Sequence, residues 1–146
     1  MDAFIEAAIE EARIGLAEGG IPIGSVIVHR GRIIGRGHNR RVQRGSAILH
    51  AEMDGLENAG RQPASVYREA VLYTTLSPCA MCSGAILLYG IPQVVICENR
   101  TFAGEEALLR SRGVQVEVLQ APACIELMRN FIAAHPGLWD EDIGVI

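Results

Sequence analysis

Four residues in two short segments have the types and the spacing of a catalytic metal centre. The first segment contributes His50 and Glu52, and the second, Ser77 to Cys82, contributes Cys79 and Cys82. Imidazole and thiolate are ligands that zinc prefers, and catalytic zinc sites keep three protein ligands with a place for water. Zinc can lower the pKa of such a water to about 7. Glu52 then remains free to move protons as a general acid and base.

The Cys-x-x-Cys pair is also compatible with two other functions, redox chemistry and a structural zinc site. A Cys-x-x-Cys that opens a helix after a strand is also the arrangement of thioredoxin-like redox proteins. The upstream His-x-Glu, the proline before the first cysteine and the missing Trp-Cys-Gly-Pro-Cys run favour zinc over redox chemistry. A purely structural zinc site would need a fourth ligand. His29, His38 and His135 are available, but their spacing recommends none of them.

Hydrophobic periodicity and turn residues predict the elements that must position these side chains. Helices are expected over residues 2–18, 50–58, 78–89, 104–112 and 121–134, and strands over 23–29, 32–36, 71–76, 93–97 and 114–119. Residues 37–49 are expected to form a loop, and no element is predicted for the tail 137–146. Strands separated by helices need crossover connections. The order predicts an α/β fold, a three-layer α/β/α sandwich around a central five-stranded mixed sheet.

The predicted strand at 71–76 leads directly into the cysteine segment. Pro78 suits the first turn of the helix that follows, because its missing N–H would have no partner there. Cys79 and Cys82 are three residues apart, so they lie on one face of that helix. The helix N-terminus lowers the thiol pKa and favours the metal-binding thiolate. Ligands of such sheets bind outside the carboxyl ends of the strands, so the metal centre is expected there, with His50 supplied by a second helix.

Composition limits the class of protein. The chain has 146 residues, of which 49% are hydrophobic, and this fits a single domain over 1–146 with a substantial core. Apolar runs fall short of the roughly 18 residues of a membrane span, and the acidic N-terminal segment does not resemble a signal peptide. A cytoplasmic protein without a membrane partner is therefore expected. Cys97 and Cys124 stand in apolar surroundings and are interpreted as free core residues.

The charge distribution bears on possible nucleic-acid partners. The net charge of −4 argues against a large nucleic-acid footprint. Six arginines nevertheless fall between Arg30 and Arg44. A solvated hairpin and loop is the favoured interpretation of this run, and a local phosphate-binding patch is the alternative. The sequence contains no lysine, which excludes Schiff-base lysine catalysis and a P-loop.

Further segments of the sequence, together with the candidate metal ligands and Glu52, match the pattern of one protein family. They are His38-Asn39, Gly45 to Glu52, Leu56 to Arg61, Leu72 to Cys79, Gly84 to Ile86, Leu88 to Pro92, Glu98-Asn99, and the tail Trp139…Glu141-Asp142-Ile143-Gly144. The signature His-x-Glu…Pro-Cys-x-x-Cys is shared by zinc nucleobase deaminases in general. The tail motif is typical of a much narrower group of proteins. Over nearly its whole length the chain resembles the fungal-type cytosine deaminases of the cytidine deaminase-like superfamily.

The resemblance implies a zinc-dependent hydrolytic deaminase that acts on a free base and releases ammonia. Cytosine is the leading candidate for that base. One Zn²⁺ per subunit would bind His50, Cys79 and Cys82, and Glu52 would be the proton shuttle. The base would be held by Asn39 at the pyrimidine edge, the Ala51 N–H at the ring carbonyl, and the Ser77 carbonyl and Asp142 at the exocyclic amine. Phe102 and Trp139 would wall and cover the base, with Ile21 near its other face. The family also implies a homodimer and a tail, about 137–146, that covers the active site.

Three positions depart from the family's pattern. Residue 51 is Ala where Gly is expected, Ala80 replaces an acidic residue, and Asp140 stands where an aromatic residue is usual. All three are expected near the pocket or its lid, so they bear on the choice of base rather than on the zinc chemistry. The alternative substrates are guanine, isoguanine or a triazine-type ring. Adenosine in tRNA is a further alternative. The net negative charge of the chain and the tail over the active site argue against this substrate.

Overall fold

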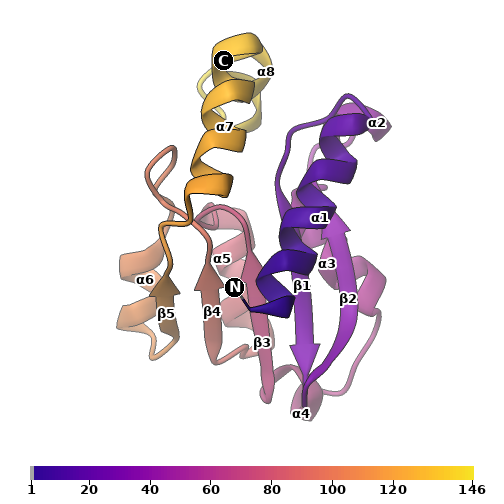
Figure 1. Ribbon diagram of the computed structural model, residues 1–146. Helices are drawn as coiled ribbons and strands as arrows, with labels where there is room; N and C mark the ends of the chain where they lie inside the picture. Colours follow the sequence, from indigo (N-terminus) through magenta and orange to yellow (C-terminus); the bar gives the residue numbers. More distant parts are fainter. Residues whose placement is uncertain (1) are drawn as a thin grey trace.

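Helices cover both faces of a central sheet in the computed structural model, which describes residues 2–146 (Figure 1). The strands of this sheet lie in the order β2-β1-β3-β4-β5. Their bounds are β1 Gly24–His29, β2 Arg32–His38, β3 Ala70–Thr74, β4 Gln93–Ile96 and β5 Gln115–Val118. β1 pairs antiparallel with β2 and β3, whereas β3, β4 and β5 run parallel. The predicted α/β fold with a mixed five-stranded sheet is confirmed.

The helices divide between the two faces of the sheet (Figure 1). One face carries α1 and α7, and the other carries α3, α5 and α6. The helix bounds are α1 Ala3–Ala17, α2 Arg41–Arg44, α3 Ala51–Ala59, α4 Ala64–Tyr67, α5 Ala80–Tyr89, α6 Glu106–Ser111, α7 Pro122–Ala134 and α8 Pro136–Asp142. The short helix α8 follows α7 at one end of the molecule, beyond the sheet.

Separate apolar clusters fill the two interfaces between sheet and helices. On the α5 and α6 side, Leu72 and Val94 of the sheet pack with Ile86 of α5 and Leu109 of α6. On the opposite side, residues of α1, β4 and α7 form a second cluster, which includes Ile5, Ile9, Val95 and Cys124. Because α3 and α5 rest on this packed sheet, their N-terminal ends have little freedom to move. Those ends carry the predicted metal ligands.

Three short helices were not predicted from the sequence. α2 lies inside the segment 37–49 that was expected to be a loop, α4 lies between α3 and β3, and α8 lies in the tail. α2 and α4 have four residues each and α8 has seven, too few for an amphipathic pattern to show. Tertiary contacts therefore decide these helices. Pro136 begins α8, which its fixed φ angle favours.

The interpretation of Cys97 and Cys124 as free thiols is wrong. Both are buried in the apolar cluster on the α1 and α7 side, as expected, but they form a disulfide in the structure. The bond joins the residue after β4 to the first turn of α7. The Cα atoms of the two cysteines lie 6.3 Å apart. The two cysteines are 27 residues apart in the chain, and neither has a sequence pattern that identifies the other. Their pairing depends on the docking of α7.

The helices of residues 2–146 are short or carry charged side chains. None of them is both long enough and apolar enough to cross a membrane.

Candidate active site

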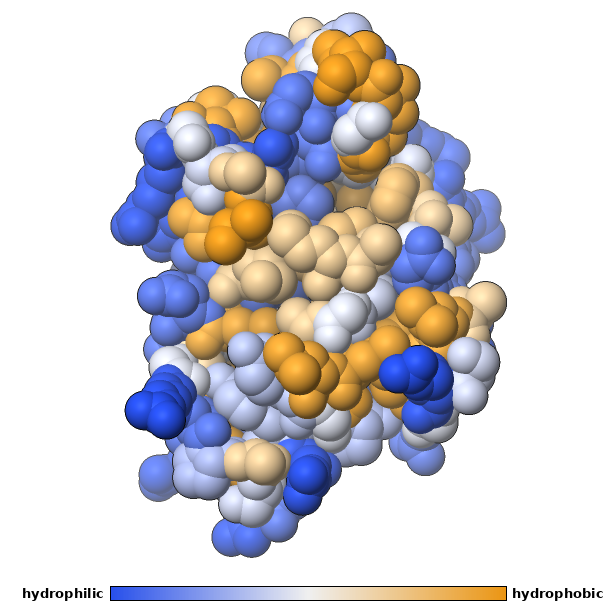
Figure 2. All heavy atoms as spheres, turned by 180° about the vertical axis from the view of Figure 1, so that it is seen from behind, coloured by the Kyte–Doolittle hydropathy of each residue, from blue (hydrophilic) through white to orange (hydrophobic). Residues whose placement is uncertain are grey.

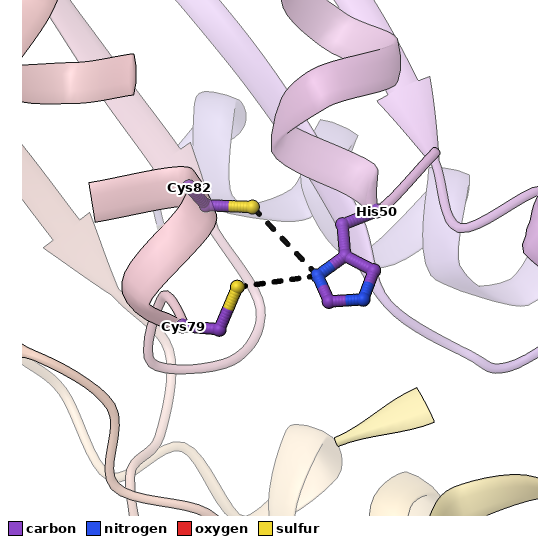
Figure 3. A group of neighbouring side chains, drawn as sticks. All are labelled: His50, Cys79 and Cys82. Carbon is purple, nitrogen blue, oxygen red and sulfur yellow. Dashed lines mark hydrogen bonds between the residues drawn. The ribbon is translucent and has the colours of Figure 1, made fainter. Parts of the chain in front are cut away.

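The three predicted metal ligands meet where α3 and α5 begin (Figure 3). His50 caps the N-terminus of α3, Cys79 caps α5, and Cys82 lies in the first turn of α5. The Nδ1 atom of His50 lies 3.4 Å from the Cys79 sulfur and 3.8 Å from the Cys82 sulfur. A tetrahedral zinc with ordinary bond lengths would place these atoms about 3.5 Å apart. The geometry and the donor set therefore fit zinc.

The two thiols share one proton in a way that favours a cation. A hydrogen bond with Cys82 lowers the pKa of the Cys79 thiol to about 4, against the opposing effect of burial. The same contact and burial raise the pKa of Cys82 above its ordinary value. The pair therefore carries a negative charge at neutral pH, and the thiolate is the form that binds metal.

Asp142 of α8 approaches the other nitrogen of the histidine ring. Its Oδ2 atom lies 3.5 Å from Nε2 of His50. Burial opposes a charge on His50, yet hydrogen bonds with Asp142 and Cys79 raise the pKa of the imidazole to about 10. Burial also opposes the charge on Asp142, but its hydrogen bonds with His50 and Asn39 lower the pKa of that carboxyl. A carboxylate behind a ligating histidine orients the ring for the metal.

Glu52 lies next to the ligand group without being part of it. It is in the first turn of α3, and only 4% of its surface is exposed. Burial raises the pKa of its carboxyl to about 7, although the nearby His50 opposes this rise. A carboxyl that titrates near neutral pH can both accept and return a proton. Glu52 is therefore placed and tuned for acid–base work.

A small cavity of about 20 Å³, with room for little more than one water molecule, opens in front of these residues. Its wall contains Ala51, Ser77, Phe102, Trp139 and Asp142 from the predicted set, together with His50, Glu52 and Cys79. The rings of Phe102 and Trp139 meet edge to face, with centroids 5.9 Å apart. Because Trp139 and Asp142 come from α8, the tail forms one side of this cavity.

Two predicted substrate residues lie outside the cavity wall. Ile21 is fully buried in the apolar cluster behind the site, and Ile23 lines the cavity instead. Asn39 is also fully buried. Its Nδ2 donates to both oxygens of Asp142 at 3.2 and 3.3 Å, and its Oδ1 accepts from the Arg41 N–H. In this structure Asn39 thus orients Asp142.

Comparison with known proteins identifies the family. The family model for the "Cytidine and deoxycytidylate deaminase zinc-binding region" matches residues 1–98, which contain His50, Glu52, Cys79 and Cys82. The chain belongs to this deaminase family. A cytosine deaminase from Candida albicans is 52% identical to it, over 96% of this chain and 94% of that protein. A tRNA-specific adenosine deaminase from Streptococcus pyogenes is 40% identical, over 88% of this chain and 87% of that protein.

A solved structure supports the same fold. The guanine deaminase from Nitrosomonas europaea matches with a TM-score of 0.73 and 25% identity, over 90% of this chain and 84% of that one. This chain is a zinc-dependent hydrolytic deaminase related to the fungal-type cytosine deaminases. The other histidines, which could have completed a structural site, have other partners. His29 contacts Glu69, His38 lies between Glu11 and Glu18, and His135 stacks on Phe131.

Arg41 is a residue of this deaminase site that sequence reasoning missed. Its Nη1 donates to Glu141 at 2.6 Å and to Asp142 at 3.1 Å, and its Nη2 donates to Glu141 at 2.9 Å. The partners are about a hundred residues away in the chain, so no local pattern links them. The only available signal was the position of Arg41 two residues after Asn39, within the arginine run.

Most of that arginine run is paired with carboxylates of the deaminase. The pairs are Arg30 with Glu69, Arg36 with Glu10 and Glu11, Arg40 with Asp54, and Arg41 with Glu141 and Asp142. Paired guanidinium groups offer little free charge to a phosphate. The structure therefore disfavours a phosphate-binding patch, and it places Arg41 in the site rather than on a solvated loop.

A buried hydrogen-bond network holds the loop that carries Phe102. Oε2 of Glu98 accepts the N–H groups of Arg100 and Thr101 at 2.7 and 3.0 Å. The Ser77 hydroxyl donates to Glu106 at 2.6 Å and accepts the Gly104 N–H at 2.8 Å. These bonds fix Ser77, which lines the cavity. Sequence reasoning did not assign Glu98 or Glu106 to the site.

Of the three departures from the family's pattern, one lies in the cavity wall. Ala51 is fully buried and lines the cavity. Ala80 is exposed at the start of α5, and Asp140 is half-buried on α8, and neither is among the lining residues. Ala51 is therefore the departure that bears most directly on the choice of base.

Proposed function

We propose that this deaminase hydrolyses cytosine to uracil and ammonia. The observation that carries the proposal is a small cavity that joins the zinc ligands and Glu52 to a wall made by the tail. The 52% identity with a cytosine deaminase over almost the whole of both chains supports the same substrate. Asp142 and the Ala51 N–H lie on this cavity and supply an acceptor and a donor for a small polar ring.

Proton transfer is the part of the reaction that Glu52 performs. Zinc, when bound, supplies a Lewis acid that lowers the pKa of water. With zinc bound, Glu52 would take one proton from the attacking water and deliver it to the ring nitrogen beside the amine-bearing carbon. As the new C–O bond becomes the product carbonyl, Glu52 would take the second proton from that oxygen and deliver it to the amine, which leaves as ammonia. Its raised pKa of about 7 allows both directions of transfer near neutral pH.

The remaining residues hold and select the base. Asp142 and the Ser77 carbonyl accept from the exocyclic amine. As the first residue of α3, Ala51 has an N–H without a partner inside the helix, and this N–H donates to the ring carbonyl. Phe102 and Trp139 cover the ring.

Two residues complete the proposed binding set. Asn39 acts from behind the cavity wall, where its amide holds the Asp142 carboxylate that contacts the base. Ile21 packs in the same apolar cluster as Trp139 and Ile23, so it acts by supporting the residues that touch the base. A site built on hydrogen bonds rejects analogues that leave its groups unpaired.

Ammonia release by the zinc-loaded protein tests the substrate. The assay compares cytosine with guanine, isoguanine, a triazine, adenine, cytidine and a tRNA anticodon stem. Turnover of cytosine, with the others far slower, supports the proposal. Efficient release from a different ring and none from cytosine would overturn the assignment of the base and leave the deaminase family intact.

Deamination of adenosine in tRNA is the second candidate, because a relative at 40% identity has that name. Two features weigh against it. The arginine run is mostly paired with carboxylates, and α8 lies across the cavity with Trp139 almost fully buried. We therefore propose no nucleic-acid partner. Release of ammonia from the anticodon stem would refute this.

The outer face of α5 supports a homodimer with one zinc per subunit. The ten residues of α5 include no charged side chain, and a helix that is hydrophobic all round is normally buried. Yet Leu88 is 75% exposed, and a side chain added at Gly84 would meet nothing within 4 Å. Apolar side chains gather across this side of the molecule (Figure 2). A second copy would cover the face, so light scattering should show a dimer that Leu88→Arg dissociates.

We propose a cytoplasmic location and a single domain over residues 1–146. Salvage of a free pyrimidine base would take place in that compartment. Disulfides are rare in the reducing cytoplasm, whereas Cys97 and Cys124 are paired but almost fully buried. Fractionation of cells, followed by rapid alkylation of thiols in denaturant, would test both the location and the pairing.

A further inference from the structure

Every nitrogen of the Arg41 guanidinium has an acceptor. Nε donates to the Ala47 carbonyl at 2.9 Å, Nη2 to Glu141, and Nη1 to both Glu141 and Asp142. The side chain is only 13% exposed. A planar guanidinium that is fixed on three sides holds a bidentate carboxylate partner in one orientation, which a lysine cannot reproduce.

The arrangement joins two short helices that could not hold their places alone. Arg41 begins α2, a single four-residue turn, and Glu141 and Asp142 end α8, a seven-residue helix. Isolated helices of such lengths are unstable in water. α8 is otherwise held by its neighbour α7 and by the apolar contacts of Trp139 and Ile143.

We propose that Arg41 is a positioning residue that latches the tail helix α8 over the cavity and sets the Asp142 carboxylate beside His50. The inference rests on the proposed function, because it assigns the latch to the same substrate site. Asp142 receives Asn39 on one side and Arg41 on another, and it faces Nε2 of His50. Loss of Arg41 leaves Asn39 and His50 as the remaining polar partners of this carboxylate.

The neighbouring arginine shows that the latch is specific to residue 41. Arg40 turns toward α3 and pairs with Asp54 at 3.0 Å. Asp54 also accepts the His38 N–H, so this pair ties β2 to α3 and does not reach the tail. Two adjacent arginines thus serve separate regions of the molecule.

The sequence provides a direct probe of the latch. Trp139 is the only tryptophan of the chain, it lies on α8, and it is 6% exposed. Its fluorescence and its quenching by acrylamide therefore report the position of the tail without any substrate. Arg30→Ala removes an exposed ion pair with Glu69 on the hairpin and serves as the matched control.

In Arg41→Ala with zinc bound, we expect Trp139 to be quenched several-fold more readily. For cytosine we expect kcat/KM to fall about 10–100-fold, mostly through KM, which is the scale typical of lost outer partners of a metal site. Arg41→Lys should rescue only part of the loss, and Arg30→Ala should match the parent protein. Glu141→Gln should also make Trp139 easier to quench. This second variant provides the test if Arg41→Ala does not fold.

Unchanged quenching of Trp139 in Arg41→Ala and Glu141→Gln would overturn the latch. An increase in quenching that is equal in Arg30→Ala would also overturn it, because it would show general loosening. The fluorescence arm does not depend on the substrate. If the parent protein fails to deaminate cytosine, the proposed function falls while the quenching result still decides the role of Arg41.

Discussion

The zinc ligands and the tail carboxylate reach the same cavity by different kinds of support. His50, Cys79 and Cys82 stand at the starts of α3 and α5, two helices that rest on the packed sheet. Asp142 stands at the end of a seven-residue helix that hydrogen bonds and one apolar cluster hold in place. Regions with few buried contacts open at lower free energy than the core. We therefore expect the tail side of the site to open at lower free energy than the metal side.

Removal of a ligand tests the metal side and should have the largest effect. Cys82→Ser replaces a fully buried metal ligand. The resulting loss of zinc affinity should exceed the roughly 10–100-fold that is typical when a residue bonded to a metal ligand is changed. Metal analysis should show well under one zinc per chain, and turnover should disappear. Full zinc content with near-normal turnover would contradict the assignment of the metal ligands.

Glu52→Gln separates chemistry from metal binding on the same side of the cavity. The amide keeps the shape but cannot carry a proton, so turnover should fall by about 10²–10⁴-fold, with one zinc still bound. Glu57→Gln, on the exposed part of the same helix, is the control and should leave the rate unchanged. Near-normal turnover in Glu52→Gln would remove Glu52 from its role.

Asp142→Asn tests the tail side and should have a smaller effect. Asn keeps the length of the side chain but removes the charge that faces Nε2 of His50 and Nη1 of Arg41. We expect kcat/KM for cytosine to fall about 10–100-fold with zinc retained. Asp140→Asn on the same helix should change it little. Equal effects of the two substitutions would show that the charge of Asp142 has no special role.

Sequence reasoning succeeded where local patterns decide the structure. Periodicity located all five strands and the longer helices, and the spacing of His50, Cys79 and Cys82 indicated a metal group that the structure brings together. It failed where distant segments meet. The Arg41 pairs and the Cys97–Cys124 bond join residues that carry no mutual signal.

The family resemblance implied Ile21 beside the base, whereas Ile23 lines the cavity and Ile21 lies in the cluster behind it. The Ile23 N–H donates to the Ile21 carbonyl at 2.8 Å. This tight turn changes the direction of the chain just before β1, so the regular alternation of side chains begins only after it. The prediction extended the strand back to residue 23, whereas β1 begins at Gly24.

The Cys97–Cys124 bond should affect stability far more than catalysis. It lies in the cluster on the α1 and α7 side, away from the residues that line the cavity. Closing a chain segment of 27 residues contributes about 3.5 kcal/mol in the chain-entropy description. For a protein of this size, Cys97→Ala should therefore lower Tm by roughly 10 °C and leave turnover within about twofold at 25 °C.

A Tm that also falls when reductant is added to the parent protein would support the bond, whereas four reactive thiols in denaturant without reductant would refute it. A large loss of turnover at unchanged zinc content would instead show that α7 transmits strain to α8, and the tail would then depend on more than its own contacts.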